Sequence, residues 1–278
     1  MNGVNQTVVN LVPDPKGNIK LLQITDTHLF ADAGKDLLGI KTVASYDAII
    51  KHAAKYAGQC AAVLCTGDLS QDHSAQSYVD FSDRIKTLEM PCYWLPGNHD
   101  MQEIMLPSLL SEGLAQTKQI ISEHWQIILL DSQVSGVPYG HLSESQLSFL
   151  EKKLQEYPEK HTLIAVHHHV LPVGAAWLDQ HILKNNDQFV ALISKFDNVN
   201  AVLSGHVHQS FDTVKNKVRY ITSPSTCVQF KPQSDDFAVD DKPPGYRYLV
   251  LTKSGKIETH VERLKPGEFT TDENATGY

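Results

Sequence analysis

Five apolar runs in this chain are each followed at once by a polar motif, and this repeated arrangement constrains the fold most. The motifs begin at Asp26, Gly67, Gly97, His167 and Gly205, and they read D-T-H, G-D, G-N-H-D, H-H-H and G-H-V-H. Apolar runs of about four to eight residues are typical of buried strands. Because helical patterns separate several of these runs, the alternation predicts βαβ units with a mainly parallel inner sheet.

The remaining periodicity predicts a single α/β domain over 19–266, with two packed mixed sheets and helices on the outer faces. An N-terminal extension (1–18) and a frayed polar tail (267–278) flank it. Two loops, Phe30–Gly39 and Phe230–Gly245, lie outside this pattern, and the second is expected either to cover the site or to lie free. We expect strands at 19–25, 61–66, 92–95, 120–121, 127–131, 162–166, 199–204, 219–222, 247–252 and 256–263, and helices at 42–56, 74–88, 143–155 and 186–196.

Composition narrows the possible partners and the compartment. A formal charge of −8 argues against non-specific binding to nucleic acid or to an anionic membrane. The first ten residues do not resemble a signal peptide, and no apolar run approaches the ~20 residues that span a bilayer. The four cysteines are scattered without CxxC spacing, which favours buried free thiols. We therefore expect a cytoplasmic protein.

The ligand types in the five motifs indicate a metal centre. Sites in open α/β sheets form at the carboxyl ends of strands, where these side chains would converge. Each motif alone is more often a turn, a helix cap or a hydrogen-bonded core histidine. Asp, His and Asn in this order and setting instead suit two ions of manganese, iron, zinc or cobalt. A dinuclear centre of this kind is typical of phosphoester hydrolysis, and it would supply the positive charge that an acidic protein lacks.

The order D-x-H, G-D, G-N-H-D, H and G-H-x-H over residues 26–208 resembles the calcineurin-like metallophosphoesterases. The amino-acid sequence around the motifs is similar to that of the class III 3′,5′-cyclic nucleotide phosphodiesterases of bacteria. The resemblance implies a four-layer αββα sandwich and hydrolysis of 3′,5′-cyclic AMP to 5′-AMP. The supporting segments are Leu22–Phe30 (LQITDTHLF), Trp94–Asp100 (WLPGNHD), Trp177–His181 (WLDQH) and Pro224–Pro232 (PSTCVQFKP).

The resemblance also implies the roles of individual residues. Asp68 would bridge two ions, and iron and/or manganese would occupy the sites, with zinc or cobalt as alternatives. A hydroxide bridging the ions would attack phosphorus in line. The first ion would be held by Asp26, His28, Asp68 and His208, and the second by Asp68, Asn98, His167 and His206.

His99 is expected to face the substrate, where it would bind a phosphoryl oxygen or protonate the leaving 3′-oxygen. The family often orients this histidine with an Asp three residues after the Gly-Asp motif. Here Gln71 occupies that place and Asp72 follows it, so a His99–Asp72 pair is a hypothesis. Asp100 is expected to anchor the turn.

In the histidine triplet only His167 matches the ligand position, which leaves His168 beside the ligands or in the pocket wall. His169 stands where relatives often have proline. Trp177, His181 and Phe230 either contact a purine ring or simply pack together. The substrate-binding residues implied by the resemblance are His28, Asp68, Asn98, His99, His168 and His208.

The motifs and the resemblance leave three functions open. The first is the cyclic AMP phosphodiesterase, whose partner would be a small cyclic nucleotide, with the protein acting as a monomer or homodimer. The second is a related enzyme that cleaves 2′,3′-cyclic nucleotides, glycerophosphodiesters or monoesters with the same ligands. The third is a catalytically inactive binding scaffold, which the complete ligand set disfavours.

Overall fold

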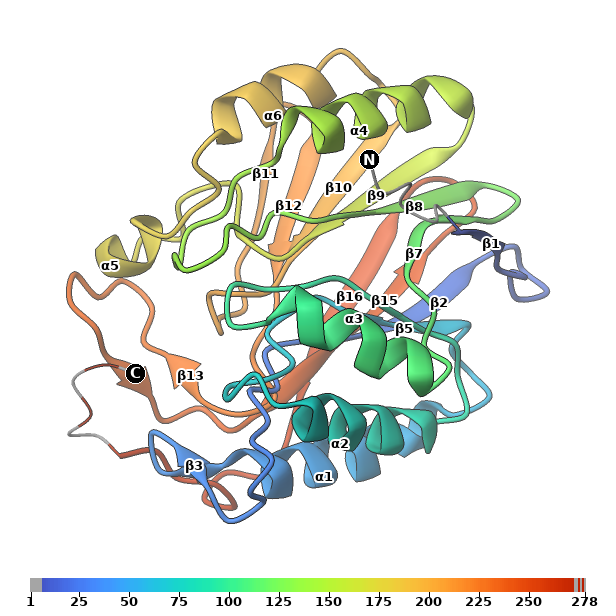
Figure 1. Cartoon of the computed structure of the whole chain (residues 1–278). Coiled ribbons are helices and arrows are strands. Elements are labelled where there is room, and N and C mark those ends of the chain that lie inside the picture. Colours follow the sequence, from blue (N-terminus) through green and yellow to red (C-terminus); the bar gives the residue numbers. More distant parts are fainter. Residues whose placement is uncertain (1–6, 273–274, 276, 278) are drawn as a thin grey trace.

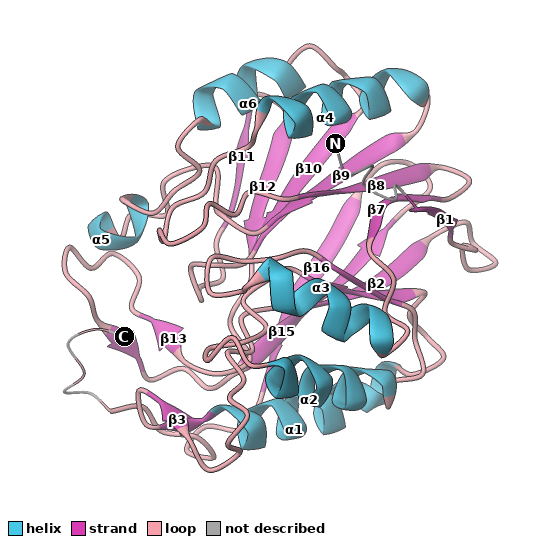
Figure 2. Cartoon of the chain, viewed as in Figure 1, coloured by secondary structure: helices cyan, strands magenta, loops and turns pink. Residues whose placement is uncertain are grey.

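The computed structural model describes residues 7–272, 275 and 277. Two mixed sheets lie face to face, and helices cover both outer faces (Figure 1). Figure 2 shows the strands as the two inner layers of the molecule and the helices as the outer ones. The predicted four-layer αββα sandwich is therefore confirmed.

The larger sheet has seven strands, and its central strands β8, β9, β10 and β12 run parallel. Strand β11 pairs antiparallel with β12 at one edge. At the other edge β7 pairs antiparallel with β8, and β1 pairs parallel with β7. In sheet order the strands are β1 (Thr7–Asn10), β7 (Thr117–Ile121), β8 (Trp125–Leu130), β9 (His161–Val166), β10 (Val199–Ser204), β12 (Val218–Thr222) and β11 (Asp212–Lys215).

The smaller sheet has five strands. Its strands β2, β5 and β6 are parallel, whereas β15 runs antiparallel to both β2 and β16. Two short hairpins, β3–β4 and β13–β14, lie outside the main sheets. In order, the sheet contains β16 (Ile257–Arg263), β15 (Gly245–Leu251), β2 (Ile19–Ile24), β5 (Ala62–Cys65) and β6 (Cys92–Trp94); the hairpin strands are β3 (Asp36–Leu37), β4 (Ile40–Lys41), β13 (Gln229–Phe230) and β14 (Val239–Asp240).

Successive residues of the central strands serve different cores, because side chains alternate across a strand. Leu21 on β2 packs between the two sheets, and Leu22 packs under the helices of the smaller sheet. Leu163 and Ile164 on β9 divide in the same way between the central core and the helices of the larger sheet. Burying each such side chain contributes roughly 1.5–3 kcal/mol.

The helices follow the predicted positions closely, apart from two that we did not expect. Ser74 and Ser143 cap α2 and α4, since each side chain accepts a backbone N–H three residues later. The unexpected helices are α3, which carries Pro107 and lacks a clear apolar face, and the four-residue α5. The helices are α1 (Thr42–Ala53) with a 3₁₀ turn (Ala54–Tyr56), α2 (Ala75–Lys86), α3 (Gln102–Ser111), α4 (Glu144–Glu156), α5 (Ala176–Asp179) and α6 (Asn186–Ile193).

Both predicted flanks contribute contacts to the domain where they are described. Strand β1 lies inside the expected extension 1–18 and adds to the larger sheet, while residues 1–6 lie outside the described part. In the expected tail, Phe269 packs against the core and the Asp272 N–H donates to the Leu38 carbonyl at 2.8 Å. The helices of the described chain are all too short or too polar to cross a bilayer.

Candidate metal centre

The structure brings the five polar motifs together beyond the carboxyl ends of β2, β5, β6, β9 and β10. Their side chains are buried, although Asn98 and His99 keep part of their surface exposed. Groups of three ligand atoms, each within 4.8 Å of the others, recur throughout the cluster. The residues that contribute to these groups are Asp26, His28, Asp68, His99, His167, His168, His206 and His208.

The first cluster consists of Asp26, His28 and His208. The His208 Nε2 atom lies 3.4 Å from Asp26 Oδ1 and 3.2 Å from His28 Nε2. All three side chains are at most 1% exposed. Two imidazole nitrogens and one carboxylate oxygen at this spacing can point at a single ion.

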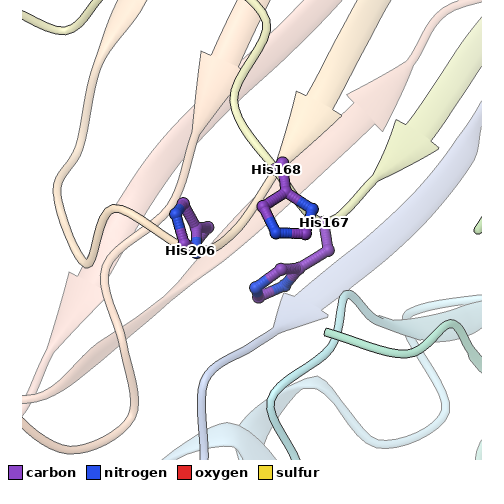
Figure 3. Close-up of side chains that lie close together, drawn as sticks. All are labelled: His167, His168 and His206. Atoms are coloured by element: carbon purple, nitrogen blue, oxygen red, sulfur yellow. The ribbon is translucent and has the colours of Figure 1, made fainter. Parts of the chain in front are cut away.

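The second cluster is built around His167. Its Nε2 atom lies 3.1 Å from Asn98 Oδ1 and 3.3 Å from Asp68 Oδ2. Figure 3 shows the rings of His167, His168 and His206 gathered together from the loops after β9 and β10. These atoms offer a second group of nitrogen and oxygen ligands beside the first.

Asp68 lies between the two clusters. Its Oδ2 atom is 3.8 Å from His28 Nε2 on one side and 3.3 Å from His167 Nε2 on the other. Its Oδ1 atom accepts the His99 backbone N–H at 2.8 Å. Burial raises the pKa of Asp68, but His167, His99 and His28 outweigh this and hold the pKa well below its usual range. One ionised oxygen therefore faces both clusters, as a bridging ligand requires.

Carbonyl oxygens set the tautomers of three ligand histidines. The Nδ1–H of His167 donates to the Thr66 carbonyl at 2.7 Å, and that of His208 donates to the Val228 carbonyl at 2.9 Å. His28 Nδ1 makes a 2.7 Å bond with Gln71 Oε1. Since each Nδ1 carries a proton, the Nε2 of each neutral ring presents its lone pair to the cluster, which is the arrangement typical of metal-bound histidines.

With these tautomers, the cluster of ligand atoms would be stabilised by a cation. The lone pairs of His28 Nε2 and His208 Nε2 face each other at 3.2 Å, where they repel unless a cation lies between the ligands. His206 Nε2 is buried and lacks a hydrogen-bond partner among the described residues. Buried nitrogens are normally satisfied, so both observations fit a site that holds metal ions.

Burial also favours the metal-binding form of two of these histidines. It lowers the pKa of His28 to about 3 and holds that of His206 well below its usual value. For His167, burial lowers the pKa, but the facing Asp68 carboxylate outweighs it and raises the pKa to about 9. A metal ion at His167 therefore competes with a proton that Asp68 stabilises.

The backbone at the ligands adopts conformations that L-residues generally avoid. Asp26, His28, Asp68, His206 and His208 all have φ between +45° and +67°. Each left-handed non-glycine residue costs on the order of 1 kcal/mol, and such strain clusters at functional sites.

The position before Asp68 has no room for a side chain. Gly67 has φ +99°, and a Cβ there would lie 2.5 Å from His167 Nδ1 and 2.7 Å from the Gly97 nitrogen. The close approach of the loops after β5, β6 and β9 thus depends on the missing side chain.

His99 and Asp100, which follow the ligand Asn98, have different surroundings. His99 packs edge-on against His28 with ring centroids 4.9 Å apart, and it lines the cavity next to the ligands. Asp100 accepts backbone N–H groups from Leu69, Ser70 and Gly97, which confirms that it anchors the turn.

The carboxylate of Asp72 accepts hydrogen bonds from its own loop and from the loop after β2. It accepts the Ala31 N–H at 2.8 Å and the Ser74 hydroxyl at 2.7 Å. These bonds join the loops after β2 and β5, and Gln71, the residue before Asp72, contacts the ligand histidine His28. A His99–Asp72 pair therefore stays a prediction.

The other two histidines of the triplet face away from the first cluster. His168 Nδ1 lies 2.8 Å from the Ser132 hydroxyl, and the side chain belongs to a group of three histidines with His167 and His206. His169 Nε2 lies 3.3 Å from Asp179 Oδ1, and its ring stacks on His206 at 5.6 Å.

Several supporting residues escaped the sequence reading. Thr66 and Val228 act through backbone carbonyls, which no side-chain pattern reveals. Gln71 and Asp179 belong to segments that were recognised, but their contacts with His28 and His169 were not predicted. Gln23 is a polar residue inside the apolar run of β2, and this break in the pattern was a signal that we did not use.

Comparison with known proteins identifies the family. A family profile described as calcineurin-like phosphoesterase matches residues 19–210, which is more than half of the chain. The chain belongs to this family.

Two relatives are similar over almost their whole length. The 3′,5′-cyclic adenosine monophosphate phosphodiesterase CpdA of Vibrio vulnificus is 49% identical, and the alignment covers 95% of this chain and 96% of the relative. The protein of the same name from Escherichia coli K12 is 45% identical with the same coverage.

Solved structures support the fold. A dimetal phosphatase from Danio rerio matches with a TM-score of 0.60 and 16% identity, covering 91% of this chain and 100% of that one. A purple acid phosphatase from yellow lupin matches with a TM-score of 0.67 and 12% identity, covering 93% of this chain and 54% of that one. At these identities the match concerns the fold alone.

Proposed function

We propose that this protein hydrolyses 3′,5′-cyclic AMP to 5′-AMP at a dinuclear metal centre. The observation that carries the proposal is the convergence of the five motifs around Asp68, in a chain 49% identical to a cyclic AMP phosphodiesterase. Such a ligand set suits phosphoester hydrolysis, and the relatives point to the cyclic nucleotide. In the reaction, a water oxygen bonds to phosphorus, the bond from phosphorus to O3′ breaks, and O3′ gains a proton.

Seven residues would hold the ions, with Asp68 shared between them. Iron and/or manganese suit these nitrogen and oxygen ligands, and zinc or cobalt would also fit. When bound, two divalent ions supply positive charge for the phosphoryl oxygens and lower the pKa of water. The proposed ligands are Asp26, His28, Asp68, Asn98, His167, His206 and His208.

The chain's own groups then act on the substrate. His99 lines the cavity beside Asn98, where its ring would bind a phosphoryl oxygen or give a proton to O3′. Its ring is held against His28, and its backbone N–H is held by Asp68. We propose a catalytic role for His99, and for Asp72 through the loop that it stabilises. The groups proposed to contact substrate are His28, Asp68, Asn98, His99, His168 and His208.

Two alternatives share the fold. The same ligands would serve cleavage of 2′,3′-cyclic nucleotides or glycerophosphodiesters, whereas an inactive scaffold is disfavoured because every ligand position is filled. We also propose a cytoplasmic location, because the four cysteines are buried free thiols, as expected in a reducing compartment.

The direct test is turnover of three substrates by protein reconstituted with manganese or iron. Release of 5′-AMP from 3′,5′-cyclic AMP should exceed turnover of cyclic GMP and of a 2′,3′-cyclic nucleotide. A His99→Gln variant, which keeps the ring's approximate size and polarity, should retain metal and lose roughly 100-fold or more in kcat. If no 5′-AMP forms above the uncatalysed rate, the proposal is wrong.

A further inference from the structure

A cavity of about 470 Å³ opens beside the metal ligands, which is within the range of small-molecule sites. Asn98, His99 and His206 form one side of it. The other side is mainly apolar and aromatic, although His73 and His181 also line the cavity, and none of the described lining residues is Asp, Glu, Lys or Arg. The apolar and aromatic residues of this side, called the aromatic wall below, are Val137, Pro138, Trp177, Leu178 and Phe237.

Three segments far apart in the sequence build this wall, and Val137 and Pro138 come from the loop between β8 and α4. Trp177 belongs to α5, and Phe237 belongs to the Phe230–Gly245 loop. The Ala176 N–H donates to the Ser234 carbonyl at 3.0 Å, which ties the helix to the loop. Figure 1 shows α5 and the β13 region on the same side of the molecule. The loop that we expected either to cover the site or to lie free thus supplies part of its wall.

Trp177 is held firmly in place. Its ring makes T-shaped contacts with Phe230 at 5.0 Å and with Phe237 at 5.1 Å. Phe230 in turn stacks on the ligand histidine His208, with centroids 4.4 Å apart. Because Trp177 and Phe237 are only half-buried, part of each ring remains accessible to the cavity that both line.

The third histidine of the triplet fixes α5 relative to the metal ligands. Asp179 at the end of α5 lies 3.3 Å from His169 Nε2 and accepts the Val173 and Gly174 N–H groups. His169 also stacks on His206. A partly buried side-chain contact therefore connects the wall to the metal ligands.

We propose that the aromatic wall is the nucleobase site, with Trp177 and Phe237 stacking on the base of a nucleotide whose phosphate lies at the metal centre. This inference rests on the proposed function and concerns how the enzyme selects its substrate. A planar uncharged base can use such a wall, since aromatic rings stack on any base face. A glycerol group has no face to stack, so the wall favours nucleotides over glycerophosphodiesters.

The test compares cyclic AMP with methyl riboside 3′,5′-cyclic phosphate, which keeps the reacting ring and lacks the base. Trp177→Leu and Phe237→Leu remove the aromatic face and keep apolar volume. Each should lower kcat/KM for cyclic AMP by about 10-fold, mainly through KM, and leave the abasic substrate and the metal content unchanged. Phe149→Leu, at a partly buried phenylalanine on α4 outside the cavity, is the matched control and should change none of these quantities.

An independent readout is equilibrium binding of products by calorimetry. The wild-type protein should bind 5′-AMP about 10-fold more tightly than ribose 5-phosphate, and Trp177→Leu should remove this preference. Equal losses for cyclic AMP and the abasic substrate, or an unchanged preference for 5′-AMP in the variant, would overturn the inference. If the wild type hydrolyses neither cyclic phosphate, the proposed function fails, and the binding preference still tests the wall.

Discussion

At the scale of single residues, the metal centre depends on side chains that are unfavourable without a cation. Five of the proposed ligands have left-handed backbone conformations, and two of them bring nitrogen lone pairs within 3.2 Å of each other. These costs are tolerated because the ligand arrangement is held by fixed partners such as the Thr66 and Val228 carbonyls.

The histidine triplet gives a sharp residue-level prediction. His167→Ala should lose one ion per chain and at least about 100-fold in activity, because its Nε2 lies beside both Asn98 and Asp68. His168→Ala should keep two ions, since the Ser132 hydroxyl engages its Nδ1 atom. Elemental analysis of the purified variants checks both. Loss of metal by His168→Ala alone would contradict the assignment.

A second prediction concerns Lys118 on β7, which is 5% exposed and whose Nζ has no partner in the described part of the chain. Burial lowers the pKa of Lys118, and Asp131 only partly opposes this. The charged form therefore destabilises the fold at neutral pH, and this penalty disappears as pH rises from the folded pKa to 10.5, the unfolded value.

Lys118→Met should accordingly raise the free energy of unfolding by about 1–2 kcal/mol at pH 7, with the gain shrinking towards pH 10.5. Urea unfolding at several pH values measures this. Lys152→Met, at an exposed position on α4, should change stability by less than about 0.5 kcal/mol. A gain that is constant across this pH range would show that the charge is not responsible.

At the scale of elements, the ends of four strands are fastened together by one buried glutamine. Gln23 on β2 donates to the Thr66 hydroxyl at 2.8 Å and to the Ser204 carbonyl at 3.1 Å, and it accepts from the Ser223 hydroxyl. These partners follow or end β5, β10 and β12, so Gln23 joins both sheets directly behind the metal ligands.

Gln23→Leu should therefore affect both stability and metal binding. Unpaired buried partners should lower the free energy of unfolding by about 2–4 kcal/mol, and looser ligand loops should weaken Mn²⁺ binding by about 10–100-fold. Gln126→Leu on β8 removes a comparable buried amide that bonds Thr162 and the Lys153 carbonyl. This control should lose stability and keep its Mn²⁺ affinity. Equal Mn²⁺ affinities of the two variants would contradict the role of Gln23.

Sequence patterns predicted most of the central strands and did not predict α3 or β1 as an element of the sheet. Strands such as β2, β5, β9 and β10 were predicted because a buried strand needs an unbroken apolar run, and the ligands followed because they end such runs. Helix α3 was missed because Pro107 and a weak apolar face conceal it. Strand β1 was placed in an extension, since a short edge strand depends on pairing with β7 and carries little pattern of its own.

Within the site, the sequence could supply the ligand types and their order, but not the atoms that orient them. The Nδ1 partners of His167 and His208 are backbone carbonyls from distant loops. The contact between His169 and Asp179 likewise depends on how the loop after β9 folds back. Such contacts arise from tertiary packing, so they leave no local signature.

At the scale of the whole molecule, metal binding should stabilise the fold, because the ligands come from both sheets and are assembled only in the native state. At a free metal concentration about 1,000 times the dissociation constant, one ion contributes about 4 kcal/mol. For a chain of 278 residues this corresponds to a rise of about 10 °C in Tm. Calorimetry with and without a chelator tests it, and an unchanged Tm would mean that the ligands are not coupled to folding.

The central claim is that one shared carboxylate, Asp68, lets this chain hold two metal ions at the edge of its sheets. The most direct measurement is the number of tightly bound ions per chain, determined by elemental analysis after gentle purification and reconstitution with manganese or iron. We predict two ions per chain in the wild-type protein and fewer than one in Asp68→Ala, because the bridging oxygen faces both clusters. A wild-type protein that binds one ion or none, or an Asp68→Ala variant that keeps two, would contradict the account.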